Sequence, residues 1–153
     1  MNSVGIDVSK GKSTIAVMRH LGEIVLSPFD VSHTSGELSA LTNQLKSLDG
    51  ETRVVMETTG NYRLPIAMAL HGAGIYVSVV NAMLIHNYGN NTLRKTKTDR
   101  KDAIKLANYG IDSWLKNNLI SLIDTVFPDV NRPFSNPARV DGSEKWVDFI
   151  ETF

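Results

Sequence analysis

An aspartate inside an apolar, β-branched run constrains the fold of this chain more than any other feature of its sequence. Asp7 lies among alternating valine and isoleucine residues, a pattern that predicts a buried strand over residues 4–8. A polar turn at residues 9–12 and a second apolar run at residues 13–18 predict a hairpin. An ionised aspartate in a buried strand costs several kcal/mol unless it is paired or bound to a metal ion.

Asp7 has two interpretations. It either caps the turn by hydrogen-bonding to its own backbone, as turn aspartates often do, or it carries a function. Ser9 and Gly11 already supply the chemistry that such a turn needs. We therefore favour a functional carboxylate.

The composition is that of an ordinary globular domain. The chain has 153 residues, 42% of them hydrophobic, and a formal net charge of zero, so we expect one domain with a substantial core. The absence of cysteine excludes a disulfide scaffold, a zinc–thiolate site and a cysteine nucleophile. The first residues do not read as a signal peptide, and no apolar run approaches the roughly 20 residues that cross a bilayer. We therefore expect a soluble cytoplasmic protein with no membrane partner.

Strand and helix patterns alternate after the hairpin. A short turn and an apolar run at residues 23–29 predict a third strand, and hence an antiparallel meander of three strands. Leucines at spacings of three and four predict an amphipathic helix with Thr34 or Ser35 as its N-cap. The pattern then predicts a strand at residues 53–56, a helix at 62–73, a strand at 75–80 and a helix at 83–88.

Glu57 directly follows the apolar strand at residues 53–56. A helix precedes this strand, so we expect the strand to be parallel to its neighbour. Sites in open α/β sheets form at the carboxyl ends of such strands, which makes Glu57 a second candidate carboxylate. The alternative is that Glu57 caps the next helix or pairs with a lysine.

Residues 94–105 carry six basic residues and two acids in a chain of zero net charge. Local basicity of this kind is typical of surfaces that bind a phosphate backbone. The alternative is a solvated helix start with Thr98 as N-cap, which explains Asp99 but not Asp102. The residues that we expect to bind phosphates are Arg94, Lys95, Lys97, Arg100 and Lys101, together with Lys10 and Lys12 in the turn after Asp7.

Asp99 and Asp102 are three residues apart in a predicted helix and therefore share one face. Their like charges repel unless a cation lies between them, and helix geometry places Asp102 deeper in the docked segment. With Asp7 and Glu57 they make four candidate carboxylates, without cysteine or clustered histidine. This set indicates Mg²⁺ or Mn²⁺ rather than zinc, and such ions support phosphoryl transfer on a nucleic-acid backbone.

The order Asp7, Glu57, Asp99, Asp102 resembles the DEDD motif of bacterial insertion-sequence transposases related to Piv-type DNA invertases. Three strings match the family in order over residues 1–114: Gly-Ile-Asp-Val-Ser-Lys, Met-Glu-Thr-Thr-Gly-Asn-Tyr and Lys-Thr-Asp-Arg-Lys-Asp-Ala. The resemblance implies an α/β, RNase H-like (RuvC-type) domain: a mixed five-stranded sheet, three antiparallel and then parallel strands, flanked by helices. It also implies Mg²⁺-dependent cleavage and rejoining of DNA by a homo-oligomer, guided in some members by an RNA that the element makes.

The same resemblance assigns a catalytic and metal-binding role to each carboxylate. Asp7 is expected to be the central ligand, able to bridge two ions. Glu57 and Asp102 are expected to complete the coordination. Asp99 is expected to be a ligand or the partner of one.

The chain departs from the family pattern in its second part. It has no room for the long helical hairpin that follows the last aspartate in the family, and no C-terminal domain with the serine thought to be the nucleophile. We expect residues 1–115 to be the catalytic domain and residues 116–153 to be a helical and irregular extension, the remnant of a longer or deleted region. Such a shortened chain is either active or, without the serine domain, inactive alone. The extension's pattern predicts a short helix at residues 119–126, a loop at 131–142 and a last helix after Ser143.

Two other function classes fit parts of the pattern. Actin-like ATPases and sugar kinases begin with a similar strand, turn and strand. They also need a second half with its own phosphate turn and adenosine site, and 153 residues are too few for both halves. The second class is a nucleic-acid-binding module without catalysis, which would bind metal and DNA or RNA and join nothing.

Overall fold

The computed structural model describes residues 1–57, 60–88 and 98–126. The chain divides into two units, Met1–Asn118 and Leu119–Phe153, and the first contains the β-sheet. The strands are β1 (Asn2–Ser9), β2 (Lys12–Arg19), β3 (Glu23–Ser32), β4 (Thr52–Glu57) and β5 (Tyr76–Val80). The helices in the described ranges are α1 (Ser35–Lys46), α2 (Leu64–Gly72), α3 (Ala82–Asn87), α4 (Asp99–Val126) and the short 3₁₀ helix η1 (His20–Gly22).

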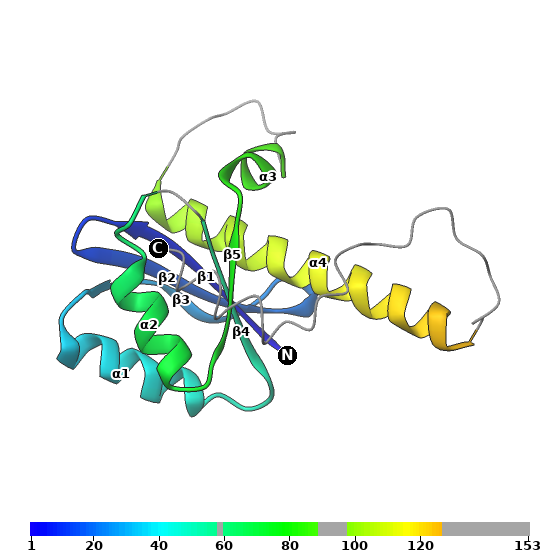
Figure 1. Ribbon diagram of the computed structural model, residues 1–153, viewed down its shortest axis with the longest axis horizontal. Helices are drawn as coiled ribbons and strands as arrows, with labels where there is room; N and C mark the ends of the chain where they lie inside the picture. Colours follow the sequence, from blue (N-terminus) through cyan, green and yellow to red (C-terminus); the bar gives the residue numbers. More distant parts are fainter. Residues whose placement is uncertain (58–59, 89–97, 127–153) are drawn as a thin grey trace. The chain divides into compact units, whose positions relative to one another are not determined.

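The sheet is mixed, with the strand order β3-β2-β1-β4-β5 (Figure 1). β1, β2 and β3 pair antiparallel because the turns between them are short, and Gly11 adopts a φ of +74° in the first turn. β4 and β5 each follow a helix and pair parallel, β4 with β1 and β5 with β4. The predicted order of three antiparallel strands followed by parallel strands is confirmed.

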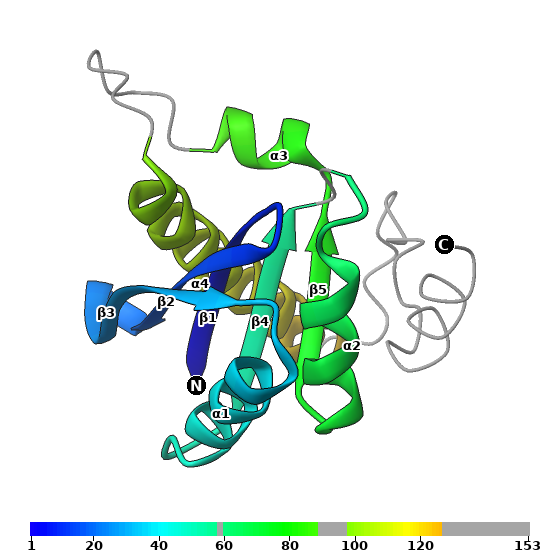
Figure 2. The same cartoon turned by 90° about the vertical axis from the view of Figure 1, so that its left-hand side faces the viewer.

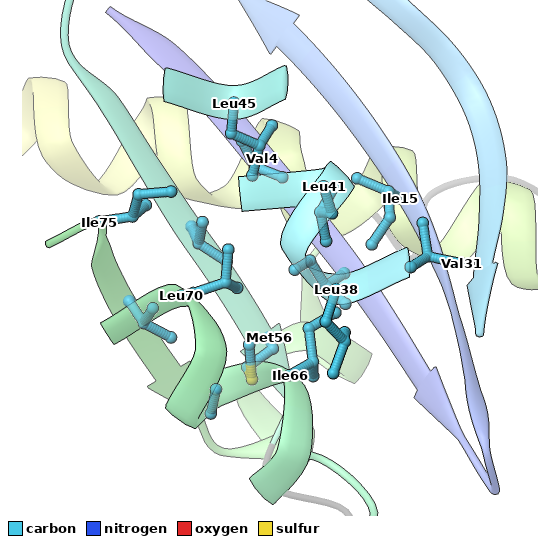
Figure 3. Packing of buried hydrophobic residues seen from close by; sticks show 14 of the residues in the cluster. Val4, Ile15, Val31, Leu38, Leu41, Leu45, Met56, Ile66, Leu70 and Ile75 are labelled. Carbon is cyan, nitrogen blue, oxygen red and sulfur yellow. The ribbon is translucent and has the colours of Figure 1, made fainter. Parts of the chain in front are cut away.

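One face of the sheet packs against α1 and α2 (Figure 2). Val4 and Ile6 of β1 point to this face and are fully buried. α1 contributes Leu38, Leu41 and Leu45, whose side chains point toward β1 and β2 in Figure 3. Each buried leucine stabilises the fold by roughly 1.5–3 kcal/mol, so the leucine spacing read from the sequence is enough to explain why α1 docks here.

The start of α1 agrees with the sequence, and the start of α2 does not. The hydroxyl of Thr34 accepts a hydrogen bond from the backbone N–H of Glu37 at 3.3 Å, which confirms Thr34 as the N-cap. α2 begins at Leu64, whereas a helix from residue 62 was predicted. The reason is Pro65, which has no N–H to donate and is favoured only in the first turn of a helix.

α4 covers the opposite face of the sheet (Figure 2). Its buried side chains include Leu106 and Trp114, which pack with Val55 of β4, and Ile111, which packs with Met18 of β2. The sheet is therefore enclosed by α1 and α2 on one side and by α4 on the other.

α4 is one continuous helix, which corrects the prediction of a separate short helix at residues 119–126. The segment at residues 115–118 contains neither glycine nor proline, so nothing in it ends a helix. The predicted loop at 131–142 and the predicted last helix lie outside the described residues. No helix in the described part of the chain is long and apolar enough to cross a membrane.

Candidate functional site

Asp7 lies near the end of β1, on the face of the sheet that α4 covers. Successive side chains of a strand point to opposite faces. Val4 and Ile6 belong to the core with α1 and α2, so Asp7 points the other way and is half-buried. The turn that follows is held by Ser9, whose hydroxyl donates to the carbonyl of Lys12 at 3.1 Å.

Glu57 is the last residue of β4 and points to the same face. Met56 belongs to the core with α1 and α2, whereas Val55 packs against α4, so Glu57 lies on the α4 side. Ile6 and Met56 are partners in the parallel pairing of β1 with β4. The next residues along the two strands are Asp7 and Glu57, and the backbones of neighbouring strands are about 4.8 Å apart.

Asp102 belongs to the first turn of α4, where its backbone N–H donates to the carbonyl of Thr98 at 3.0 Å. The next residue, Ala103, is fully buried. Its carbonyl oxygen lies directly against Gly5 of β1. Asp102 therefore lies beside the strand that carries Asp7.

The two aspartates of α4 differ in burial. Asp99 is exposed, while Asp102 is half-buried, which confirms the prediction that Asp102 lies deeper. Among the described residues, Oδ2 of Asp102 is buried and has no hydrogen-bond partner. A buried carboxylate oxygen without a partner is costly, and a cation bound at this oxygen would remove that cost.

These carboxylates do not form a closed cage around an ion. Within the ranges that the structure describes, no three Asp, Glu or His side chains are grouped closely enough to hold a metal. Mg²⁺ is commonly held by one or two carboxylates, with water and substrate phosphates completing the coordination. The hard oxygen donors and the buried oxygen of Asp102 fit such an open site.

Comparison with known proteins decides the family. A family model for DEDD transposases of the IS110 type, described as transposase, matches residues 4–125. The chain belongs to this transposase family. The resemblance inferred from the sequence is thereby confirmed.

Curated relatives of this transposase chain include two pilin gene-inverting proteins, from Moraxella bovis and Moraxella lacunata. Each is 40% identical over 57 residues, which is 37% of this chain. The matched segment spans only 18% of the length of either relative.

Solved structures similar to the transposase chain include two of RuvC. One is T. thermophilus RuvC in complex with Holliday junction substrate, with a TM-score of 0.56 and 15% identity, covering 75% of this chain and 96% of that one. The other is Thermus thermophilus RuvC, with a TM-score of 0.53 and 15% identity, covering 76% of this chain and 97% of that one. These likenesses confirm the predicted RNase H-like, RuvC-type fold.

Four of the predicted phosphate-binding residues of the transposase chain are described, and they lie close in sequence to its carboxylates. Lys10 and Lys12 are exposed in the turn after Asp7. Lys12 also approaches Asp30, with 3.8 Å between Nζ and Oδ2, and both side chains are about half exposed. Such an exposed ion pair contributes little to stability and leaves Lys12 accessible.

The second basic group is at the start of α4, where Arg100 and Lys101 are exposed. The other predicted phosphate-binding residues, Arg94, Lys95 and Lys97, lie outside the described residues.

The sequence interpretation missed the residues that dock α4 on the sheet. Gly5 allows the two backbones to touch, and Ser3 donates from its buried hydroxyl to the carbonyl of Ala107 at 2.6 Å. Gly110 of α4 fits against the side chains of Ser3 and Val55. A glycine inside a strand often marks the close approach of another backbone, so the signal was present at Gly5.

Proposed function

We propose that this chain is the catalytic domain of a DNA transposase or site-specific recombinase, and that it cleaves and transfers DNA strands with Mg²⁺ or Mn²⁺. Membership of the transposase family and the RuvC-type fold support this proposal. The observation that carries it is the shared position of Asp7, Glu57 and Asp102. They come from β1, β4 and α4, and they lie on one side of the sheet.

The carboxylates have distinct roles in this proposal. A bound divalent ion would activate the attacking oxygen and stabilise the leaving oxygen of a phosphodiester. Asp7 would be the central ligand, with Glu57 beside it and Asp102 reaching in from α4. Asp99, exposed at the helix start, would be a ligand or would orient one.

The basic residues would hold the DNA backbone against these carboxylates. Lys10 and Lys12 extend from the turn after Asp7, and Arg100 and Lys101 lie between the two aspartates of α4. Contacts of this type position a nucleic acid without reading its sequence. By sequence alone, the proposal extends to Arg94, Lys95 and Lys97.

The proposal includes partners that the fold leaves open. One RuvC neighbour was solved in complex with a Holliday junction substrate, so we propose branched DNA as the first substrate to test. A guide RNA and a homo-oligomer are further parts of the proposal. We also propose residues 1–115 as the catalytic domain, because this range contains the five-stranded sheet and lies within the compact unit Met1–Asn118.

A second candidate function is DNA binding without cleavage. It is favoured by the finding that no three candidate ligands are grouped within the described ranges. In this case Arg100, Lys101 and the turn after Asp7 would still bind DNA, and the carboxylates would hold an ion too weakly for catalysis.

Cleavage of labelled DNA by the full chain tests the proposal. A four-way junction and a linear duplex of the same sequence are incubated with the chain in Mg²⁺, in Mn²⁺ and in EDTA. We expect metal-dependent cleavage that Asp7→Asn and Glu57→Gln abolish. Glu23→Gln is the matched control, because Glu23 is an exposed carboxylate at the start of β3, where it pairs with the far end of β2 from the turn after Asp7. Binding without cleavage would support the second candidate, and cleavage that survives Asp7→Asn would contradict the assigned site.

A further inference from the structure

Gly5 is the point at which α4 touches the sheet backbone to backbone. A Cβ atom at this position would lie 1.9 Å from the carbonyl oxygen of Ala103 and 2.5 Å from the backbone nitrogen of Ala107. Both neighbours are main-chain atoms of buried residues, Ala103 and Ala107, so no side chain can rotate away to make room. An ordinary contact begins at 3.4 Å, so a Cβ here would push the helix outward by about 1.5 Å (3.4 minus 1.9).

Further contacts fix the position of α4 along β1. The hydroxyl of Ser3 donates to the carbonyl of Ala107 at 2.6 Å. A Cβ at Gly110 would lie 2.7 Å from the Ser3 hydroxyl oxygen. Ala103, Ala107 and Gly110 are four and three residues apart, so they form one stripe along the helix. This stripe is the surface on which α4 rests.

The Gly5 contact lies next to two of the proposed metal ligands. Asp7 is two residues after Gly5 on β1 and points to the same face, because side chains alternate along a strand. Asp102 directly precedes Ala103 on α4. The separation of Gly5 from Ala103 therefore sets how far Asp102 lies from Asp7. Metal sites tolerate errors of only about 0.5 Å in ligand position, which is less than the shift that a Cβ would cause.

We propose that Gly5 is a positioning residue of the metal site, which holds Asp102 at coordinating distance from Asp7 by letting α4 rest on β1. This inference depends on the proposed function, because it requires that the carboxylates bind a divalent ion. Gly5 touches neither metal nor DNA in this proposal. Its effect passes through the backbone of α4.

A purely structural role for Gly5 makes a different prediction, and Gly110 provides the matched control. Gly110→Ala also crowds the interface of α4 with the sheet, against Ser3, Val55 and Trp114. Gly110 is eight residues from Asp102, or about 12 Å along a helix that rises 1.5 Å per residue. Changes at that distance usually act independently. Gly110→Ala should therefore cost stability and leave metal affinity unchanged.

The test measures binding of Mn²⁺ alone to the full chain, with free Mn²⁺ quantified by its electron paramagnetic resonance signal. Circular dichroism and thermal unfolding report the fold of each variant. We expect the Kd of folded Gly5→Ala to rise by about tenfold or more, as for residues that orient metal ligands. For Gly110→Ala we expect a lower Tm and a Kd within about twofold of wild type.

Two results would overturn the inference alone. One is a folded Gly5→Ala chain with wild-type affinity for Mn²⁺. The other is an equal loss of affinity in Gly110→Ala, which would show that any loosening of α4 has this effect. Two other results would overturn the metal site itself, and this inference with it. One is a wild-type chain that shows no saturable Mn²⁺ binding, and the other is Mn²⁺ binding that Asp7→Asn does not remove.

A pair of variants at Ser3 decides the question if Gly5→Ala does not fold. Ser3→Ala removes the hydrogen bond to Ala107 without adding volume. Ser3→Val places a methyl group at the position of the hydroxyl oxygen, 2.6 Å from the carbonyl oxygen of Ala107, which is too short for a carbon–oxygen contact. The substitution therefore pushes α4 away from the sheet at Ala107, one helical turn after Ala103. Weaker Mn²⁺ binding in Ser3→Val than in both Ser3→Ala and Gly110→Ala supports the inference, because Ala107 is closer to Asp102 than Gly110 is, and affinities that are equal or reversed overturn it.

Discussion

The hydroxyl of Tyr88 donates a hydrogen bond to Oδ2 of Asp112 at 2.5 Å, and this contact joins the end of α3 to the middle of α4. The ring of Tyr88 also meets that of Tyr109 edge to face, with 5.4 Å between the ring centroids. Lys105 adds a hydrogen bond from Nζ to the carbonyl of His86 at 3.4 Å. α3 is a short helix, and these contacts with α4 hold it in place.

Replacing Tyr88 with phenylalanine should destabilise the chain by about 1 kcal/mol, because it removes a hydrogen bond to a carboxylate and keeps the ring contact. The pKa of Tyr88 is raised from 10.0 to about 12. Burial is the largest cause, and the hydrogen bond to Asp112 and the negative charge of Asp112 add to it. The folded state therefore favours the neutral phenol. Its contribution is complete below pH 10 and is lost as the pH rises toward 12.

Urea unfolding of wild type and Tyr88→Phe at neutral pH, with titration of tyrosinate absorbance, measures both effects. Tyr62→Phe is the matched control, since Tyr62 is exposed. Equal stability of wild type and Tyr88→Phe would show that the contact with Asp112 contributes nothing.

The sequence predicted the sheet well because its signals are local. The alternation around Asp7 and the leucine spacing of α1 each follow from the period of one element. The same local reasoning placed Asp7 and Glu57 on apolar strands, and the structure adds that these strands are neighbours. It also placed Asp102 deeper than Asp99, because a helix that docks on a sheet must bury one side.

The contacts that bring α4 onto the sheet could not be predicted in this way. They join residues about a hundred positions apart, such as Ser3 and Ala107, and no periodic pattern links them. The length of α4 also differs from the prediction, because the apolar spacing of residues 119–126 predicts a short helix of its own and the structure continues α4 through residues 116–118. Asparagine is a weak helix former, but it does not end a helix as proline does.

His33 gives the fold a dependence on acid. Its Nε2 shares a hydrogen bond of 2.8 Å with the hydroxyl of Ser13, which is buried on β2. Desolvation by burial lowers the pKa of His33 from its usual 6.5, so the folded state favours the neutral ring. The contribution of His33 is therefore complete above pH 6.5 and is lost as the pH falls through the lowered pKa.

We expect His33→Gln to be less stable than wild type at neutral pH, by about 0.5–1.5 kcal/mol, and to lose less stability on acidification. Thermal unfolding from about pH 8 to about pH 5 measures this, with His20→Gln as control because His20 is exposed. Parallel pH profiles for wild type and His33→Gln would assign the acid sensitivity to other groups.

Asp7→Asn should abolish metal binding and leave the fold intact or slightly more stable, since it removes one of several neighbouring negative charges. Asp102→Asn should act in the same direction, because Oδ2 of Asp102 is buried without a partner among the described residues. Without metal, we expect each variant to equal wild type or exceed it by up to about 1 kcal/mol.

Thermal unfolding with and without Mn²⁺ separates these contributions. An ion at a hundred times its Kd stabilises the chain that binds it by about 2.7 kcal/mol, so wild type should gain stability and both variants should not. Glu23→Gln should gain as wild type does. Failure of Asp7→Asn to fold would show that Asp7 is a structural residue.

The basic residues at the start of α4 should determine how DNA binding depends on salt. Each phosphate contact releases counterions from duplex DNA, so the slope of log Kd against log salt concentration changes by about 0.9 per contact. Replacing both Arg100 and Lys101 with glutamine should therefore reduce this slope by about 2 if each binds one phosphate. Lys46→Gln should leave the slope unchanged, because Lys46 is an exposed lysine in the last turn of α1, on the other side of the sheet.

Fluorescence anisotropy of labelled duplex and four-way-junction DNA, from low to physiological salt, gives the slopes. An unchanged slope in the double variant would place the DNA away from α4, and the turn after Asp7 would then be the next surface to test with Lys10→Gln and Lys12→Gln.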